Sequence, residues 1–228
     1  TLDYWKLLND FEDLVTGPYR RDHGEAPVLR ARSPGSLSPS GAEGESLDSI
    51  ADEIHTCRGC GLSAFRKNSV PGEGNPNPRV LIIGEGPGAQ EDESGKPFVG
   101  RAGQYLDKWI EAIGLSREQS VFITNVVKCR PPENRDPEEA EMRACFRYLL
   151  RQIALLEPEA ILCLGRYAGR RISGIETSLS NLRGETYSFE GIPVIVTYHP
   201  SAVLRNAELR RPVWEDLQRL KQLLQGES

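Results

Sequence analysis

Four of the five cysteines in the chain are spaced like the ligands of a metal centre. Cys57 and Cys60 form a Cys-x-x-Cys pair, while Cys129 and Cys145 are predicted on a loop and inside a helix. Four soft thiolate ligands suit zinc or an iron-sulfur cluster, and the spacing alone leaves both open. An odd number of cysteines with no recognisable secretory signal disfavours a disulfide framework. Cys163 lies in an apolar run and is expected to be a buried core residue.

A second candidate site is the glycine-rich loop that follows the apolar run Val80 to Ile83. The run is typical of a short buried strand, and a loop at its end is the expected binding position in an open α/β sheet. The loop, Gly84-Glu85-Gly86-Pro87-Gly88, has its third glycine one residue too early for a dinucleotide fingerprint. A P-loop is excluded because Gly95-Lys96 is followed by proline. We therefore expect no nucleotide cofactor.

Three further residues stand where they could join the glycine loop. Asn125 is polar within an otherwise apolar run, His199 follows the last predicted strand, and Phe98 lies among turn residues. Each has an ordinary structural explanation when taken alone, although a buried amide without partners costs about 1 to 3 kcal/mol. Because parallel strands end at one edge of a sheet, we expect all three to meet Glu85 there.

Strands alternate with helices along the chain. Helices are predicted over 46–56, from about 103, over 137–156 and 166–172, and from 212. Strands are predicted over 80–83, 121–127 and 159–165, followed by a hairpin of 186–189 and 192–198 around Glu190-Gly191. This alternation predicts an α/β protein, a three-layer α/β/α sandwich with a short, mostly parallel central sheet.

Residues 1–48 are predicted to form an N-terminal extension of the domain at 49–228. Residues 1–15 have the apolar spacing of a short helix, and residues 24–46 are rich in Gly, Pro and Ser, which predicts a disordered linker. The extension is a candidate for binding a protein partner, and a tolerated addition without a partner is the alternative. The formal net charge of -5 argues against a protein that coats nucleic acid. We expect a soluble, cytoplasmic monomer with no membrane segment.

The segment from Cys57 to Arg205 resembles the family 4 uracil-DNA glycosylases, the iron-sulfur branch of their superfamily. The matching motifs are CRGC, GEGPGAQEDESGKPFVGRAG, ITNVVKCRPPENRDP, the helical Cys145 and YHPSAVLRN, in the family's order over about two-thirds of the chain. The resemblance implies a uracil-DNA glycosylase-like fold. It also favours a structural 4Fe-4S cluster over zinc, held by Cys57, Cys60, Cys129 and Cys145.

The resemblance further implies roles for the residues at the sheet edge. Excision of uracil leaves a uracil anion and a cationic sugar, so it requires donors near the base oxygen and negative charge near the sugar. The base must also leave the stack. Phe98 would stack on uracil, Asn125 would read its edge and His199 would hydrogen-bond its O2. The backbone of Gly84, Glu85 and Gly86 would line the pocket, and we assign Glu85 to water activation or cation stabilisation.

Other assignments by resemblance lie at the rim of this pocket. Glu91 is a candidate for excluding the methyl group of thymine. Ser201, Leu204 and Arg205 are expected to contact DNA, with Leu204 as the candidate wedge into the duplex. The chain departs from the family at Ala202-Val203, where family members usually carry a bulkier residue.

The predicted function is monofunctional hydrolysis of the uracil N-glycosidic bond in single- or double-stranded DNA, in base excision repair of deaminated cytosine. A lyase would need an amine nucleophile, and the motif loops offer only Lys96 and Lys128, which have structural explanations. Relatives that trap DNA covalently carry a histidine in an insertion where residues 130–135 have none. The alternative from another class is a non-catalytic iron-sulfur DNA-binding module, accessory to a polymerase or repair complex. It would not require Glu85, Phe98, Asn125 and His199 together.

Overall fold

The computed structural model describes residues 45–226 of the chain. The helix predicted over 1–15 and nearly all of the predicted linker lie outside the described residues. The first described helix, α2 (Leu47–Thr56), starts inside the range assigned to the extension, and Ser46 caps it by accepting a hydrogen bond from the backbone amide of Ser49. Within residues 45–226, no helix is both long and apolar enough to cross a bilayer.

A mixed sheet of six strands forms the centre of the described domain, in the order β1-β3-β2-β4-β6-β5. The inner strands are parallel to one another, while β1 and β5 pair antiparallel at the two edges. Glu190 and Gly191 both have positive φ, as a tight hairpin turn between β5 and β6 requires. The strands are β1 (Glu73–Gly74), β2 (Val80–Gly84), β3 (Val121–Asn125), β4 (Ala160–Leu164), β5 (Thr186–Phe189) and β6 (Ile192–Thr197).

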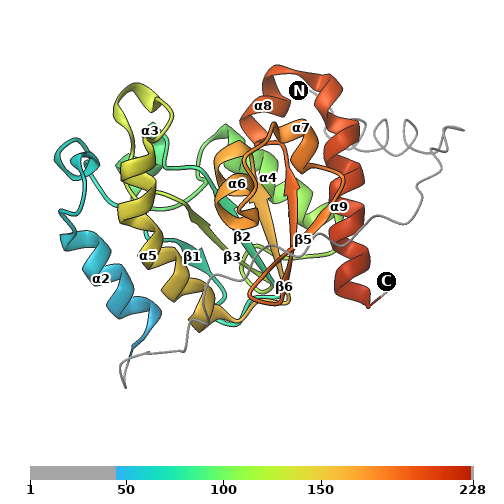
Figure 1. The fold of residues 1–228 in the computed structure, drawn as a ribbon, viewed down its shortest axis with the longest axis horizontal. Coiled ribbons are helices and arrows are strands. Elements are labelled where there is room, and N and C mark those ends of the chain that lie inside the picture. The colour runs from blue at the N-terminus through green and yellow to red at the C-terminus, as the bar shows by residue number, and fades with distance from the viewer. Residues whose placement is uncertain (1–44, 227–228) are drawn as a thin grey trace, which may run out of the picture.

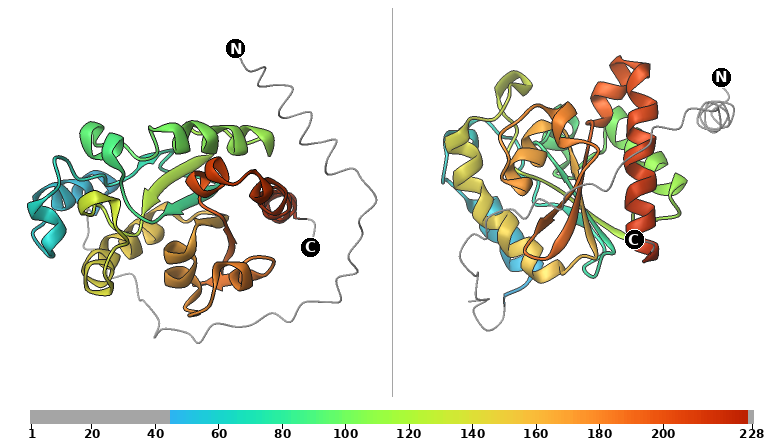
Figure 2. Two further views of the ribbon diagram at one scale, coloured as in Figure 1. Left: turned by 90° about the horizontal axis from the view of Figure 1, so that it is seen from above. Right: turned by 45° about the vertical axis from the view of Figure 1, so that its right-hand side comes forward.

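Successive apolar residues of each inner strand enter two separate cores. Val80 and Ile82 of β2 pack with α4 (Arg101–Ala112), α8 (Pro200–Arg205) and α9 (Arg210–Gln225), whereas Leu81 and Ile83 pack with α5 (Glu139–Leu156), α6 (Arg166–Ser173) and α7 (Leu179–Leu182). Figure 1 shows α5 and α9 on opposite sides of the sheet, and both views in Figure 2 keep them apart. Helices thus cover both faces of the sheet, as strands buried on both faces require, and the predicted three-layer sandwich is confirmed.

Several predicted boundaries were wrong by a few residues. β3 ends at Asn125 and not at Val127, because the amide of Val127 bonds to Glu85, the residue next to the one that Val126 bonds, which breaks the alternating pattern of a parallel ladder. α5 begins at Glu139, two residues after the proline predicted to start it.

The acidic run after the glycine loop forms a short helix that the sequence did not predict, α3 (Ala89–Ser94), which ends at Gly95 with φ of 74°. Three 3-10 turns complete the described elements: η1 (Gly61–Ala64), η2 (Pro132–Asn134) and η3 (Ala207–Leu209).

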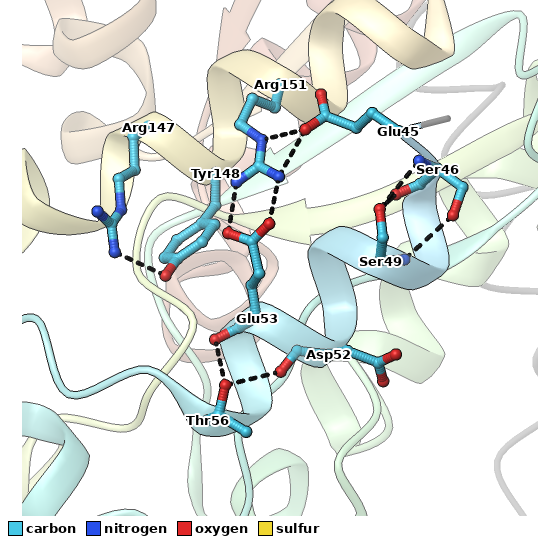
Figure 3. A network of polar contacts seen from close by, with 9 residues as sticks. All are labelled: Glu45, Ser46, Ser49, Asp52, Glu53, Thr56, Arg147, Tyr148 and Arg151. Carbon is cyan, nitrogen blue, oxygen red and sulfur yellow. Dashed lines mark hydrogen bonds and ion pairs between the residues drawn. The ribbon is translucent and has the colours of Figure 1, made fainter. Parts of the chain in front are cut away.

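Helix α2 packs against α5 through a small cluster of its own. Ile50 and Ile54 contact the buried ring of Tyr148. Arg151 of α5 forms ion pairs of 2.6 Å with both Glu45 and Glu53, which Figure 3 shows beside the Ser46 cap. These contacts fix the end of α2 that leads into Cys57.

Candidate functional site

A cavity of about 820 Å³ opens at the carboxyl ends of the parallel strands. Residues that follow β2, β3, β4 and β6 meet in its wall, and segments distant in sequence complete it. Of the sequence-predicted site residues, it includes Glu85, Gly86, Glu91, Phe98, Asn125, His199, Ser201 and Arg205. Gly84 and Leu204 are not among the lining residues. The predicted meeting at one sheet edge is therefore observed for most of the set.

Gly84 forms the floor beneath two of these side chains. A Cβ atom at this position would collide with Oδ1 of Asn125 and would lie 2.8 Å from the ring of Phe98. The backbone at Gly84 has regular strand conformation and pairs with Asn125 of β3. Glycine is needed here because two side chains approach the backbone closely, and not because φ is unusual. Gly84 thus supports the cavity without lining it.

Asn125 presents an amide that the protein itself does not satisfy. The side chain is buried, and neither Nδ2 nor Oδ1 has a hydrogen-bond partner within the described residues. Burial of an amide without partners destabilises the folded state by about 1 to 3 kcal/mol. Since the residue lines the cavity, its donor and acceptor are available to a ligand with the opposite pattern.

His199 enters the cavity as a neutral imidazole with its proton on Nε2. Burial and the nearby Arg205 lower the pKa of His199 to about 4, with Glu91 opposing the shift. The backbone amide of Ser201 donates to Nδ1 over 3.2 Å, so Nδ1 must be the unprotonated nitrogen. The residue also caps α8 through this bond. The remaining nitrogen, Nε2, is left as a hydrogen-bond donor.

Glu85 is a carboxyl group near its point of half ionisation at neutral pH. Burial and the negative charge of Asp136 raise the pKa of Glu85 to about 7, and Arg166 partly offsets them. Asp136 accepts hydrogen bonds from Arg166 (3.0 Å) and from the hydroxyl of Tyr167 (2.6 Å). These three residues were not predicted from the sequence, although Arg166 follows β4 at the same edge of the sheet and that position could have revealed it.

Phe98 supplies a ring held in an unusual backbone conformation. Its φ is 50°, which is rare for a bulky residue and costs on the order of 1 to 3 kcal/mol. The ring is buried and lies 5.5 Å from that of His199. The carboxylate of Glu91 accepts hydrogen bonds from the amides of Val99 (2.9 Å) and Gly100 (3.1 Å), directly after Phe98. Glu91 therefore shapes this turn, and its suggested role against thymine stays a prediction.

Helix α8 carries the residues predicted to contact DNA. The hydroxyl of Ser201 lies 2.8 Å from Nδ1 of His199. Leu204 is 42% exposed, whereas Val203 is buried in the core beside α4 and α9. Of the apolar residues on this short helix, Leu204 thus points outward, as a wedge would have to.

Cys57 directly follows α2, Cys60 directly precedes η1, Cys129 lies in the segment after β3, and Cys145 lies within α5. Burial raises the pKa of Cys129, and the charges of Cys60 and Cys57 add to the rise while Arg66 opposes it. Burial likewise raises the pKa of Cys145 to about 11, with Cys129 and Cys60 adding to the rise and Lys128 opposing it. Within residues 45–226, however, no three Cys, His, Asp or Glu side chains are grouped to hold a metal ion. Cys163 is buried in β4, as predicted.

The surroundings of the sulfur atoms are rich in hydrogen-bond donors. Arg66 donates to Sγ of Cys129 over 2.9 Å, the amide of Gly59 donates to Cys57 over 3.3 Å, and the amide of Lys128 donates to Cys145 over 3.3 Å. Such donors stabilise thiolate ligands. The donor set therefore fits a metal-thiolate group, although the four sulfurs do not converge on a single ion.

Comparison with known proteins agrees with the geometry. Residues 71–218, more than half of the chain, match the family model of the Uracil DNA glycosylase superfamily. A "Type-4 uracil-DNA glycosylase" from Saccharolobus solfataricus is 48% identical over 189 residues, which cover 79% of this chain and 87% of that protein. Proteins with the same name from Sulfurisphaera tokodaii and Archaeoglobus fulgidus are 46% and 43% identical over 78% of this chain and 85% and 94% of their own lengths. The chain therefore belongs to the uracil DNA glycosylase superfamily.

Proposed function

We propose that the chain is a monofunctional uracil-DNA glycosylase that hydrolyses the N-glycosidic bond of uracil in DNA and leaves an abasic site for base excision repair. The observation that carries this function is the buried, unpartnered amide of Asn125 in a cavity that also holds a neutral histidine and a carboxyl group. An amide without partners in the folded protein can form its hydrogen bonds with a ligand.

The Asn125 amide matches uracil and not cytosine. Its Nδ2 can donate to O4 of uracil while its Oδ1 accepts from N3–H. In this orientation of the amide, cytosine would place its amino donor against Nδ2 and its unprotonated N3 against Oδ1, so both amide atoms would face like groups. The ring of Phe98 provides a stacking surface for the flipped base, and Gly84 lets both side chains reach their places.

His199 stabilises the leaving group through Nε2–H. As the glycosidic bond breaks, negative charge develops on the uracil ring and at O2, where a fixed donor is most useful. A neutral imidazole suits this role because the bond from the Ser201 amide to Nδ1 fixes both the tautomer and the ring orientation. The backbone holds the donor in place before the reaction begins.

Glu85 acts on the sugar side of the bond in its ionised form. A carboxylate there stabilises the cationic sugar or accepts a proton from the attacking water. No lysine is among the cavity-lining residues of the described chain, and the amine of Lys128 is buried and donates to Asn125 O (2.8 Å) and Gln152 (2.7 Å). These contacts support water as the nucleophile and a reaction that leaves the DNA backbone uncut.

We infer that Cys57, Cys60, Cys129 and Cys145 hold a 4Fe-4S cluster. The hydrogen bonds to three of the sulfurs support thiolate ligation. Four thiolates alone would suit zinc as well, and it is the resemblance to the family 4 enzymes that favours the cluster. When bound, the cluster supplies a cross-link between α2, the segment after β3 and α5.

The rim of the cavity is proposed to bind DNA. Arg205 lines the cavity and is exposed, so it can reach a phosphate, while the outward Leu204 can enter the stack that the flipped base leaves. We propose that Glu91, which lines the cavity and is fixed by backbone amides, limits the room for a thymine methyl group.

Excision from a labelled oligonucleotide with one uracil, single- or double-stranded, tests the function. Alkali cuts abasic sites, and a thymine strand serves as control. We expect breaks only in the uracil strand and only after alkali. Breaks without alkali would refute monofunctional hydrolysis. Binding without breaks, from protein with its full iron content, would refute the enzyme and favour the non-catalytic DNA-binding module.

A further inference from the structure

We propose that Arg117 is a positioning residue that holds the stacking ring of Phe98 in place from behind. The inference rests on the proposed function, since it assigns a residue to the base-stacking step. Arg117 is absent from the cavity lining and follows α4 in the chain, so it does not itself meet the base.

The contacts of Arg117 converge on the backbone at Phe98. Its Nη2 donates to the carbonyl of Pro97 over 2.6 Å, and its Nη1 donates to the carbonyl of Phe98 over 3.3 Å. Nη1 also bonds to Asp107 of α4 over 2.7 Å. A guanidinium fork can satisfy two carbonyls and a carboxylate at once, a geometry that a lysine ammonium does not reproduce.

These bonds act where the backbone is strained. Phe98 has a φ of 50°, a conformation that a phenylalanine keeps only when its surroundings impose it. Arg117 holds the carbonyls of the two peptide groups that flank the Cα atom of Phe98, and Glu91 holds the amides of Val99 and Gly100 that follow it.

Gly103 leaves room for this arrangement, because a Cβ atom there would collide with the carbonyl oxygen of Phe98. The strained turn is therefore fixed by a cation, an anion and a glycine. Only Glu91 of these three borders the cavity.

The first test compares Arg117→Ala with Asp107→Asn under single-turnover conditions on uracil-containing DNA. We expect Arg117→Ala to excise about 10- to 100-fold more slowly, since a displacement of about 1 Å in a reacting group has effects of that size. Asp107→Asn weakens the ion pair but leaves the bonds to both carbonyls, so its rate should stay within about twofold of wild type. An equal loss in both variants would assign the effect to the ion pair and overturn the inference.

A double-mutant cycle then asks whether Arg117 works through the ring. In a Phe98→Ala background, the further change Arg117→Ala should alter the rate by less than about twofold, because the group it positions is gone. Losses that multiply would show that Arg117 acts elsewhere and would refute its positioning role. Melting curves of each variant separate this effect from unfolding.

A crystal structure of Arg117→Ala gives a readout independent of catalysis. We expect φ of Phe98 to leave the left-handed region and the ring to move from its place beside His199. An unchanged backbone and ring would overturn the inference even if the wild type excises uracil. Absence of excision by the wild type, with a moved ring in the variant, would refute the proposed function and leave the positioning role standing.

Discussion

The ionisation of Glu85 should control the pH dependence of excision. With a pKa of about 7 for Glu85, its ionised fraction rises from roughly 9% at pH 6 to roughly 91% at pH 8. If the carboxylate is the active form, the single-turnover rate rises about tenfold over that interval. His199 adds no titration there, because its pKa is about 4 and it is neutral throughout.

The assay is single-turnover excision between pH 5.5 and 8.5 at constant ionic strength. Glu85→Gln should lose about 10²- to 10⁴-fold in rate and show no rise near pH 7. Asp136→Asn removes the negative charge that helps to raise the pKa of Glu85, so its rise should shift to lower pH. A flat wild-type profile, or the same rise in Glu85→Gln, would refute the assignment of this ionisation to Glu85.

The raised pKa of Glu85 also predicts how the stability of the folded protein changes with pH. The folded pKa of Glu85 lies above that of an unfolded glutamate, so the protein loses stability as the pH rises from about 4.5 through about 7. Glu85→Gln removes that loss. Its melting temperature should exceed that of the wild type at pH 8 and match it at pH 4, and the reverse order would contradict the raised pKa.

Three further outcomes are expected. Asn125→Ala should lose most excision while the loss of its amide removes no hydrogen bond from the folded protein; excision at the wild-type rate would remove Asn125 from base recognition. Gly84→Ala should excise at least about tenfold more slowly, since its Cβ would displace Asn125 and Phe98; a wild-type rate would show that both side chains can shift freely. Cys145→Ser should lose iron and brown absorbance together with thermal stability; retention of iron would remove Cys145 from the ligand set.

The order of the elements could be predicted because apolar periodicity is a local property of the chain. The runs at β2, β3 and β4 have nowhere to lie except between two layers of helices, so the sandwich followed from them. The meeting of Glu85, Asn125 and His199 also followed, since Asn125 ends a parallel strand and the other two come shortly after one. These inferences required no knowledge of side-chain packing.

What could not be predicted depends on contacts between distant segments. The reason for glycine at position 84 is visible only once Asn125 and Phe98 lie above it. Helix α3 was missed because an acidic run has no apolar periodicity, and its helical form is fixed partly by Glu91 bonding back to the amide of Gly88. The hydrogen bond from Arg117 to the carbonyl of Pro97 joins residues 20 positions apart and has no sequence signature.

The separate packing of α2 makes it a candidate for opening independently of the sheet. It is held by the cluster of Ile50, Ile54 and Tyr148, by the ion pairs of Arg151 and by hydrogen bonds from Arg66 to its last turn, while the sheet has its own two cores, which α2 meets through Leu47. A unit with so few buried contacts can exchange its amide hydrogens through local opening at a lower free energy than the strands. A cluster bound to Cys57 would hold the C-terminal end of α2 and thereby suppress its local opening. Hydrogen exchange of α2 would then report the iron content of the protein without any DNA present.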